Sequence, residues 1–144
     1  MIIIMFKQIS VFVENKNGRL ADVLNVLRDN GINIYAVHIA DTTNFGILRF
    51  IVDKTEEAKQ VIEKAGFAVK TTNVLAVGMG DEVGSLCNII NILKEENIPV
   101  EYLYAFAVRV EKNRAVVVIK TEDNSKAESV LKKAGYTMPD NNSL

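Results

Sequence analysis

The sequence predicts an α+β fold made of two tandem ferredoxin-like units, each with the order β-α-β-β-α-β. The units are expected to form an extended antiparallel sheet with helices on one face. Three observations carry this prediction. The chain repeats itself, some segments alternate apolar and polar residues, and others carry apolar residues at helical spacing.

The repeat is visible in two pairs of segments. Residues 18–34 resemble residues 84–100, an offset of 84 − 18 = 66, and residues 58–66 resemble residues 127–135, an offset of 135 − 66 = 69. The difference of 69 − 66 = 3 residues predicts an insertion, which we place in the turn at Val110–Arg114. We therefore expect one domain at residues 1–72 and a second at 73–144, joined by a short connector at about Thr71–Asn73.

The first copy opens with a strand, because the apolar residues Ile9, Val11 and Val13 alternate with Gln8 and Ser10. A helix follows, with apolar residues at positions i, i+3, i+4 and i+7, and it ends at Asn30–Gly31, which is typical of a left-handed cap. Two strands come next, at 32–40 and 45–52. A second helix that ends at Gly66 and a short strand at 67–71 complete the copy.

The second copy follows the same order. A strand is predicted at 74–79, a helix on the stripe from Leu86 to Leu93, strands at 100–110 and 114–120, and a helix that ends at Gly135. Pro139 is expected to cut the last strand short.

The strands at 45–52 and 114–120 are apolar on both faces. If Leu48, Phe50, Val52, Val117 and Ile119 point at the helices, then Ile47, Ile51, Val116 and Val118 point away from them. That outer face is too apolar for open water, so we expect a second copy of the chain to cover it in a homodimer.

Composition excludes several classes of function. Seventeen basic and 18 acidic residues give a net charge of −1, which argues against nucleic acid as a partner. The apolar runs are too short for a membrane span or a signal peptide, so no membrane partner is expected. Cys87 is the only cysteine; no disulfide is therefore possible within the chain, and a reducing cytoplasmic location is expected.

Residues that carry catalysis are scarce. His38 is the only histidine, and we interpret it as a satisfied or surface side chain. Cys87 is interpreted as a packing residue, because no second histidine is present to act as its base. One cysteine and one histidine cannot form a structural zinc site, and the glycines at 78, 80 and 84 are out of register for a dinucleotide loop. No cofactor, metal or enzymatic activity is expected.

The remaining candidate site is the loop before the first helix of each copy. Free N–H groups and the positive end of the helix dipole point outward from such a glycine-bearing turn, which suits a carboxylate. Asn15 and Asn33 offer amides that donate and accept, and Asp81 offers a negative charge for an amino group. The candidate loop residues are Asn15, Lys16, Asn17, Gly18, Arg19 and Leu20 in the first copy, and Asp81, Val83, Gly84, Ser85 and Leu86 in the second.

The repeated unit and its Asp/Asn-x-x-Gly-x-Leu loop resemble the ACT domain, a regulatory module that binds small molecules. The resemblance covers Lys7 to Tyr136 as two tandem copies. Glu14–Leu20 followed by Gly31–Ile34 is similar to the serine-binding ACT domain of phosphoglycerate dehydrogenase, in which two asparagines bind the ligand; they correspond to Asn15 and Asn33 here. The family's proline before the glycine is Asn17 in one copy and Val83 in the other.

The resemblance also implies where a ligand lies. ACT domains pair side by side through their second strands, and ligands bind between one domain's loop and strand residues of its neighbour. The corresponding strand residues lie near Ile34–Ala36 and Val100–Tyr102, and Tyr102 or Tyr104 could form a wall for the ligand side chain. In the second copy Asp81 and Pro99 replace the two asparagines, so the two sites are expected to differ.

Three functions are consistent with the sequence. The first is a non-enzymatic, allosteric sensor that binds a free amino acid at the interface between ACT domains and acts on a separately encoded enzyme. The second is a structural or protein-interaction module without a ligand. The third, a small enzyme on this fold, would need an acid, base or nucleophile set that the sequence does not show.

Overall fold

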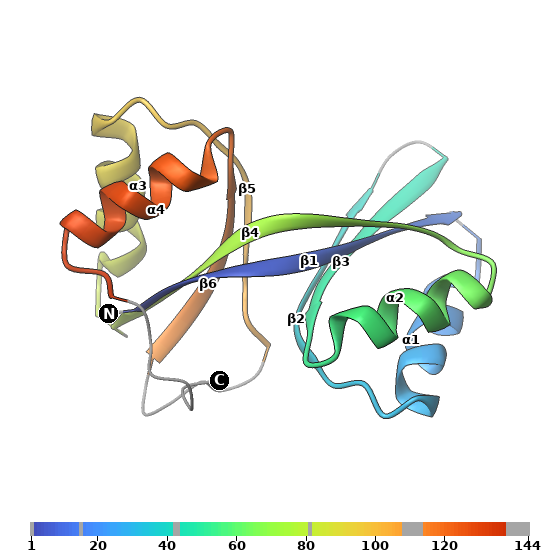
Figure 1. Ribbon diagram of the computed structural model, residues 1–144. Coiled ribbons are helices and arrows are strands. Elements are labelled where there is room, and N and C mark those ends of the chain that lie inside the picture. Colours follow the sequence, from blue (N-terminus) through green and yellow to red (C-terminus); the bar gives the residue numbers. More distant parts are fainter. Residues whose placement is uncertain (1, 15, 42–43, 81, 108–113, 138–144) are drawn as a thin grey trace. The chain divides into compact units, whose positions relative to one another are not determined.

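The structure, a computed structural model, describes residues 2–14, 16–41, 44–80, 82–107 and 114–137. Ten elements follow one another along these residues (Figure 1). They are β1 (Ile2–Glu14), α1 (Arg19–Asp29), β2 (Ile34–Asp41), β3 (Phe45–Val52), α2 (Thr55–Lys64), β4 (Ala68–Gly80), α3 (Ser85–Glu95), β5 (Val100–Ala105), β6 (Arg114–Thr121) and α4 (Asn124–Lys133). The predicted α+β class is confirmed, and the order β-α-β-β-α occurs in both copies. The strands predicted at 67–71 and 74–79 form one strand, β4.

The chain forms two compact units. Lys7–Thr72 forms the N-terminal unit, and Met1–Phe6 together with Asn73–Leu144 forms the C-terminal unit. Hydrogen-bonded strands follow the order β2-β3-β1-β4 in the first and β1-β4-β6-β5 in the second. The β1–β3, β2–β3, β4–β6 and β5–β6 pairs are antiparallel.

Two strands contribute to both units. β1 and β4 are each 13 residues long, and the boundary between the units falls after Phe6 in β1 and after Thr72 in β4. The predicted connector at Thr71–Asn73 is therefore wrong, because these residues continue a strand. Val-Lys-Thr-Thr-Asn-Val lacks glycine and proline and is rich in β-branched residues, so nothing in it breaks a strand. The division into domains at residues 72 and 73 stays a prediction. The compact units divide the chain at the same place, but Met1–Phe6 belongs to the C-terminal unit.

The helices form where apolar periodicity predicts them. A glycine with positive φ follows α1, α2 and α4, whereas Asn97 has that conformation after α3. α1 buries Val23 and Leu27 on one face. Gly31 has φ +67°, and the N–H groups of Gly31 and Ile32 donate to the carbonyls of Arg28 and Leu27 at 3.1 and 3.0 Å. This pair of bonds is a Schellman cap, and it confirms the predicted end of the helix.

Each unit has its own apolar core between its helices and its strands. Ile9, Leu48, Phe50 and Val52 lie in the N-terminal core, and Val117 and Ile119 lie in the C-terminal core, as their alternation predicted. The positions of these side chains confirm which residues of β3 and β6 face the helices.

The sheet face that points away from the helices is less exposed to solvent than the sequence predicted. Ile51 is 1% exposed and Val118 is 0% exposed within the single chain. For these two residues the expected cover by a second chain is wrong, because they are already out of water. In the C-terminal unit, Ala76 and Val116 form a small second cluster on this face, with Phe6 and Phe106 packed against them. Ile51 and Val118 therefore give no support for a homodimer.

The Val110–Arg114 insertion lies mostly outside the described residues, and so does Pro139. β5 ends at Ala105, earlier than the predicted strand end at residue 110; Phe106 is still bonded to Val116, and the residues from 108 lie outside the described part. Beyond α4, Thr137 accepts a hydrogen bond from the N–H of Ile3 at 2.8 Å.

Tyr136 makes the C-terminal core sensitive to alkaline pH. Burial raises the pKa of its phenol above the ordinary value of 10.0. Above pH 10 the unfolded chain ionises this group while the folded chain keeps it neutral, so stability that is present below pH 10 is lost as the pH rises. We expect the thermal midpoint to fall less steeply for Tyr136→Phe than for wild type between about pH 9 and 11, measured by circular dichroism. Parallel curves for the two proteins would contradict this assignment.

Candidate functional site

The two glycine-bearing loops lie directly before α1 and α3. Lys16, Asn17 and Gly18 connect β1 to α1, and Glu82, Val83 and Gly84 connect β4 to α3. Arg19, Leu20, Ser85 and Leu86 are the first residues of the two helices. Asn15 and Asp81 lie outside the described residues.

The two loops share one backbone conformation. Gly18 and Gly84 are the N-cap residues, with φ of +89° and +87°. The N–H of Arg19 donates to the carbonyl of Lys16 at 3.3 Å, and the N–H of Ser85 donates to the carbonyl of Glu82 at 3.2 Å. Left-handed backbone of this kind favours glycine, so the repeated glycine is a structural requirement of the loop.

A glycine at the N-cap leaves the helix start without a capping side chain. Neither Gly18 nor Gly84 provides a side-chain bond, and the first intrahelical bonds run from the N–H groups of Asp22 and Asn88 to the two glycine carbonyls, each at 2.9 Å. The first N–H groups of a helix have no partner within the helix, and they lie at its positive end. Both loops therefore present an environment that suits an anionic oxygen.

The side chains around this common backbone differ in charge. The N-terminal loop carries two cations: the Lys16 ammonium lies 3.1 Å from the Glu14 carboxylate, and the Arg19 guanidinium lies 3.3 Å from the Asp22 carboxylate. The C-terminal loop carries Glu82 and no cation among its described residues. Among the described side chains, cations therefore flank the N-terminal loop alone, and each lies beside a carboxylate.

Arg19 is positioned by a contact that sequence reasoning missed. Its guanidinium lies 4.4 Å from the centroid of the Phe67 ring, and Phe67 is part of the N-terminal core. Such a cation–π contact fixes the side chain at the helix start. Arg19 and Phe67 are 67 − 19 = 48 residues apart, so no local sequence pattern predicts their contact.

Apolar side chains lie exposed beside both loops. Leu20 and Leu86 occupy the first turns of α1 and α3 and are exposed, although their spacing assigned them to the buried stripe. Val83 at the tip of the second loop is fully exposed. Val83 and Leu86 therefore place two exposed apolar side chains beside the second loop, and Leu20 places one beside the first.

Asn33 and Ile34 lie at the far end of α1 from the loop. α1 has 11 residues, so about 16 Å of helix separates the two places. The backbone of Asn33 is pinned to Asp53: its N–H donates to the carboxylate at 3.0 Å, and its carbonyl accepts from the Asp53 N–H at 3.2 Å. Its side-chain amide makes no bond to another described residue. The loop and Asn33 of one N-terminal unit therefore do not meet within that unit.

Tyr102 lies on β5, the edge strand of the C-terminal unit, where its ring stacks on Tyr104 with 6.4 Å between centroids. Cys87 was expected to pack, and that expectation is wrong, because its side chain is exposed on α3. Position 87 falls outside the apolar stripe formed by residues 86, 89, 90 and 93. Cys87 accepts a weak bond from the Asn91 amide at 3.4 Å.

Among the described residues, no three histidine, cysteine, aspartate or glutamate side chains cluster as metal ligands. No helix in the described part of the chain is both long and apolar enough to cross a membrane.

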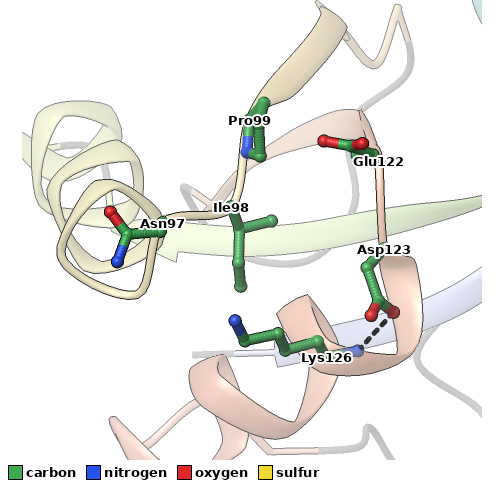
Figure 2. Close-up of a pocket in the computed structure, with 6 residues that line it drawn as sticks. All are labelled: Asn97, Ile98, Pro99, Glu122, Asp123 and Lys126. Atoms are coloured by element: carbon green, nitrogen blue, oxygen red, sulfur yellow. Dashed lines mark hydrogen bonds between the residues drawn. The ribbon is translucent and has the colours of Figure 1, made fainter.

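An open pocket of about 340 Å³ lies at the far end of α3 in the C-terminal unit (Figure 2). It is lined by Asn97, Ile98, Pro99, Glu122, Asp123 and Lys126. Two of its charged groups hold the chain itself: Asp123 caps α4 by accepting the Lys126 N–H at 3.0 Å, and the Lys126 ammonium donates to the carbonyl of Glu96 at 3.1 Å. Pro99 occupies the position of Asn33 in the repeat, so this end of the C-terminal unit lacks the amide that the N-terminal unit offers.

Comparisons with known proteins point to one family. The family described as "ACT domain pair" matches residues 4–143. Protein BT0572 from Bacteroides thetaiotaomicron is similar to this chain, with 37% sequence identity and a TM-score of 0.84 over 92% of this chain and 90% of that chain. None of the curated protein sequences matches.

More distant structures share the fold alone. The ligand-free regulatory subunit of aspartate kinase from Thermus thermophilus is 17% identical, with a TM-score of 0.62 over 92% of this chain and 96% of that chain. The aspartokinase alpha and beta subunits are 19% identical, with a TM-score of 0.60 over 93% and 97%.

Proposed function

The chain belongs to the family of ACT domain pairs, and on that premise we propose that it is a non-enzymatic regulatory protein that binds a small free amino acid. The repeated loop conformation at Gly18 and Gly84 is the observation that carries this proposal. A helix start without a capping side chain suits the carboxylate of an amino acid, and nearby amide and carboxylate groups suit its ammonium.

The N-terminal loop is the proposed primary site. Lys16 and Arg19 add positive charge there, whereas Glu82 repels an anion at the other loop. The ligand contacts proposed are the N–H groups near Gly18 and the side chains of Asn15, Lys16 and Arg19. The C-terminal loop, with Asp81, Val83, Ser85 and Leu86, would take a different ligand or bind more weakly.

The proposed site is completed by a second copy of the chain. Asn33 and Ile34 are about 16 Å of helix away from the loop of their own unit, so they can reach a ligand only in a neighbouring unit. β2 is the edge strand of the N-terminal unit, and its Val37 and Ile39 are 41% and 48% exposed. They lie in register with the buried Phe50 and Leu48, so they extend the apolar rows of the core to an uncovered edge. We propose that β2 of a second copy covers this edge in a homodimer.

The response would be a change in the contacts of the dimer or in the pose of the domains, read by a separately encoded enzyme. A ligand can shift such an equilibrium only by binding one pose more tightly than the other. A cytoplasmic location stays a prediction from the single cysteine.

A thermal-shift screen with the twenty amino acids tests the proposal. A ligand at 100 times its Kd adds about 2.7 kcal/mol to the free energy of unfolding, which raises the midpoint of a chain this size by about 5 °C or more. The amide of the best ligand, which lacks the carboxylate, is the control and should lose most of the shift. A screen without any shift would refute amino-acid binding and favour an interaction module whose contact surface includes Val83 and Leu86.

A further inference from the structure

The first residues of β1 belong to the C-terminal unit, although most of that unit lies more than 60 residues further along the chain. Ile3 is fully buried in the C-terminal core, and Met5 packs against the same core. On the other face of the strand, the Phe6 ring lies 6.3 Å from the ring of Phe106 and packs against Ala76 and Val116. Both faces of the segment are therefore used by the C-terminal unit.

The backbone of this segment is held on both edges. β1 is the hydrogen-bonded neighbour of β4, and on the other side the N–H of Ile3 donates to the carbonyl of Thr137 at 2.8 Å. Main-chain bonds of this kind supply affinity for an added strand, and the alternating side chains supply specificity.

The repeat shows why the segment is needed. In the N-terminal unit the place beside β1 is taken by residues 68–72, which follow α2 in the same copy. In the C-terminal unit the equivalent place beside β4 is taken by Ile2–Phe6 instead. The described residues between 73 and 137 therefore form three strands and two helices, with a place for a fourth strand.

We propose that the C-terminal unit is a strand acceptor. Its slot beside β4 binds a short apolar strand, its occupant is the chain's own segment Ile2–Phe6, and the slot accepts the same segment when it is supplied as a separate peptide. The proposal does not depend on amino-acid binding by the loops.

Two substitutions in one strand provide a matched comparison. Ile3 and Ile9 are both isoleucines of β1 with 0% exposure, but they belong to the C-terminal and the N-terminal core respectively. We expect Ile3→Ala in the full chain to raise hydrogen-exchange rates in α3 and α4 by about tenfold or more, and Ile9→Ala to do so in α1 and α2. Faster exchange in α1 and α2 alone for Ile3→Ala would overturn the proposal.

A peptide experiment tests the slot itself. In full-length Ile3→Asp the charged side chain at position 3 cannot be buried in the C-terminal core, so α3 and α4 should lose protection from hydrogen exchange. A millimolar peptide of residues 1–7, with added lysines for solubility, should restore that protection at least severalfold. The same peptide carrying Ile3→Asp should restore nothing, and the wild-type peptide should not rescue Ile9→Asp.

The other possible outcomes also either support or overturn the proposed slot. If Ile3→Ala and Ile9→Ala accelerate all four helices alike, selective rescue of Ile3→Asp by the wild-type peptide still supports the slot, and rescue of neither variant overturns it. Full protection of α3 and α4 in Ile3→Asp without any peptide would show that the unit needs no fourth strand.

Discussion

Replacing Val37 and Ile39 together by lysine is expected to halve the mass of the protein in solution, from twice the chain mass of 16.0 kDa to a single chain. Both side chains lie on the β2 edge and are already partly exposed, so the substitution removes little from the core of the chain itself. In a two-fold dimer the same edge faces itself, so the new lysines of the two copies would repel one another. Sedimentation or light scattering at micromolar concentration measures the mass.

The repeat supplies the control for this experiment. Leu103 and Ala105 on β5 correspond to Val37 and Ile39, and they lie in register with Ile119 and Val117. Lysine at both β5 positions adds the same charge to the other edge strand and should leave the mass unchanged. Because the proposed site needs Asn33 from the partner, the β2 variant should also lose its amino-acid response. A wild-type protein that is already a monomer would refute the dimer.

Gly18→Ala is expected to abolish the stabilisation by the best amino acid, whereas Gly84→Ala should retain it. No atom lies within 4 Å of a methyl group added at either glycine, so the effect comes from the backbone alone. With φ near +90° at both positions, each alanine should cost about 1–2 kcal/mol of unfolding free energy and distort its loop. Only the loop that binds the ligand should then also lose the ligand's contribution of about 2.7 kcal/mol.

Thermal-shift titrations of Gly18→Ala and Gly84→Ala with the best amino acid measure this difference. The two variants strain equivalent positions, so each corrects for the general destabilisation of the other. Retention of the full shift by Gly18→Ala would exclude the N-terminal loop. Loss of the shift in Gly84→Ala alone would move the site to the C-terminal loop, against the charge argument made from Lys16 and Arg19.

Local sequence patterns predicted most of the fold. The helical spacing of Val23 and Leu27 and the positive φ of Gly31 are properties of a few neighbouring residues, and the structure confirms them. The repeated glycines predicted a turn before each of the two helices, and the structure adds that both adopt positive φ, which few other residues do. These signals are local, so a single sequence is sufficient to read them.

Long-range pairing was not predictable in the same way. Nothing in the sequence Met-Ile-Ile-Ile-Met-Phe indicates which unit the segment joins, and its counterpart in the other copy is chemically different. The stacking of Arg19 on Phe67 and the burial of Ile51 likewise depend on residues far away in sequence. In the proposed ligand site, the groups that would meet Asn33 and Tyr102 come from a neighbouring domain, and a pattern within one chain does not reveal them.

The crossing of β1 between the two units has a consequence for how such a protein can evolve. Copies that each close their own sheet can be separated, shuffled or lost by recombination at their junction. A cut between codons 72 and 73 of this gene would instead leave one product with surplus apolar residues at its start and another with an open sheet edge. The two copies are therefore expected to be inherited together, because residues 73–144 alone would lack a strand of their unit.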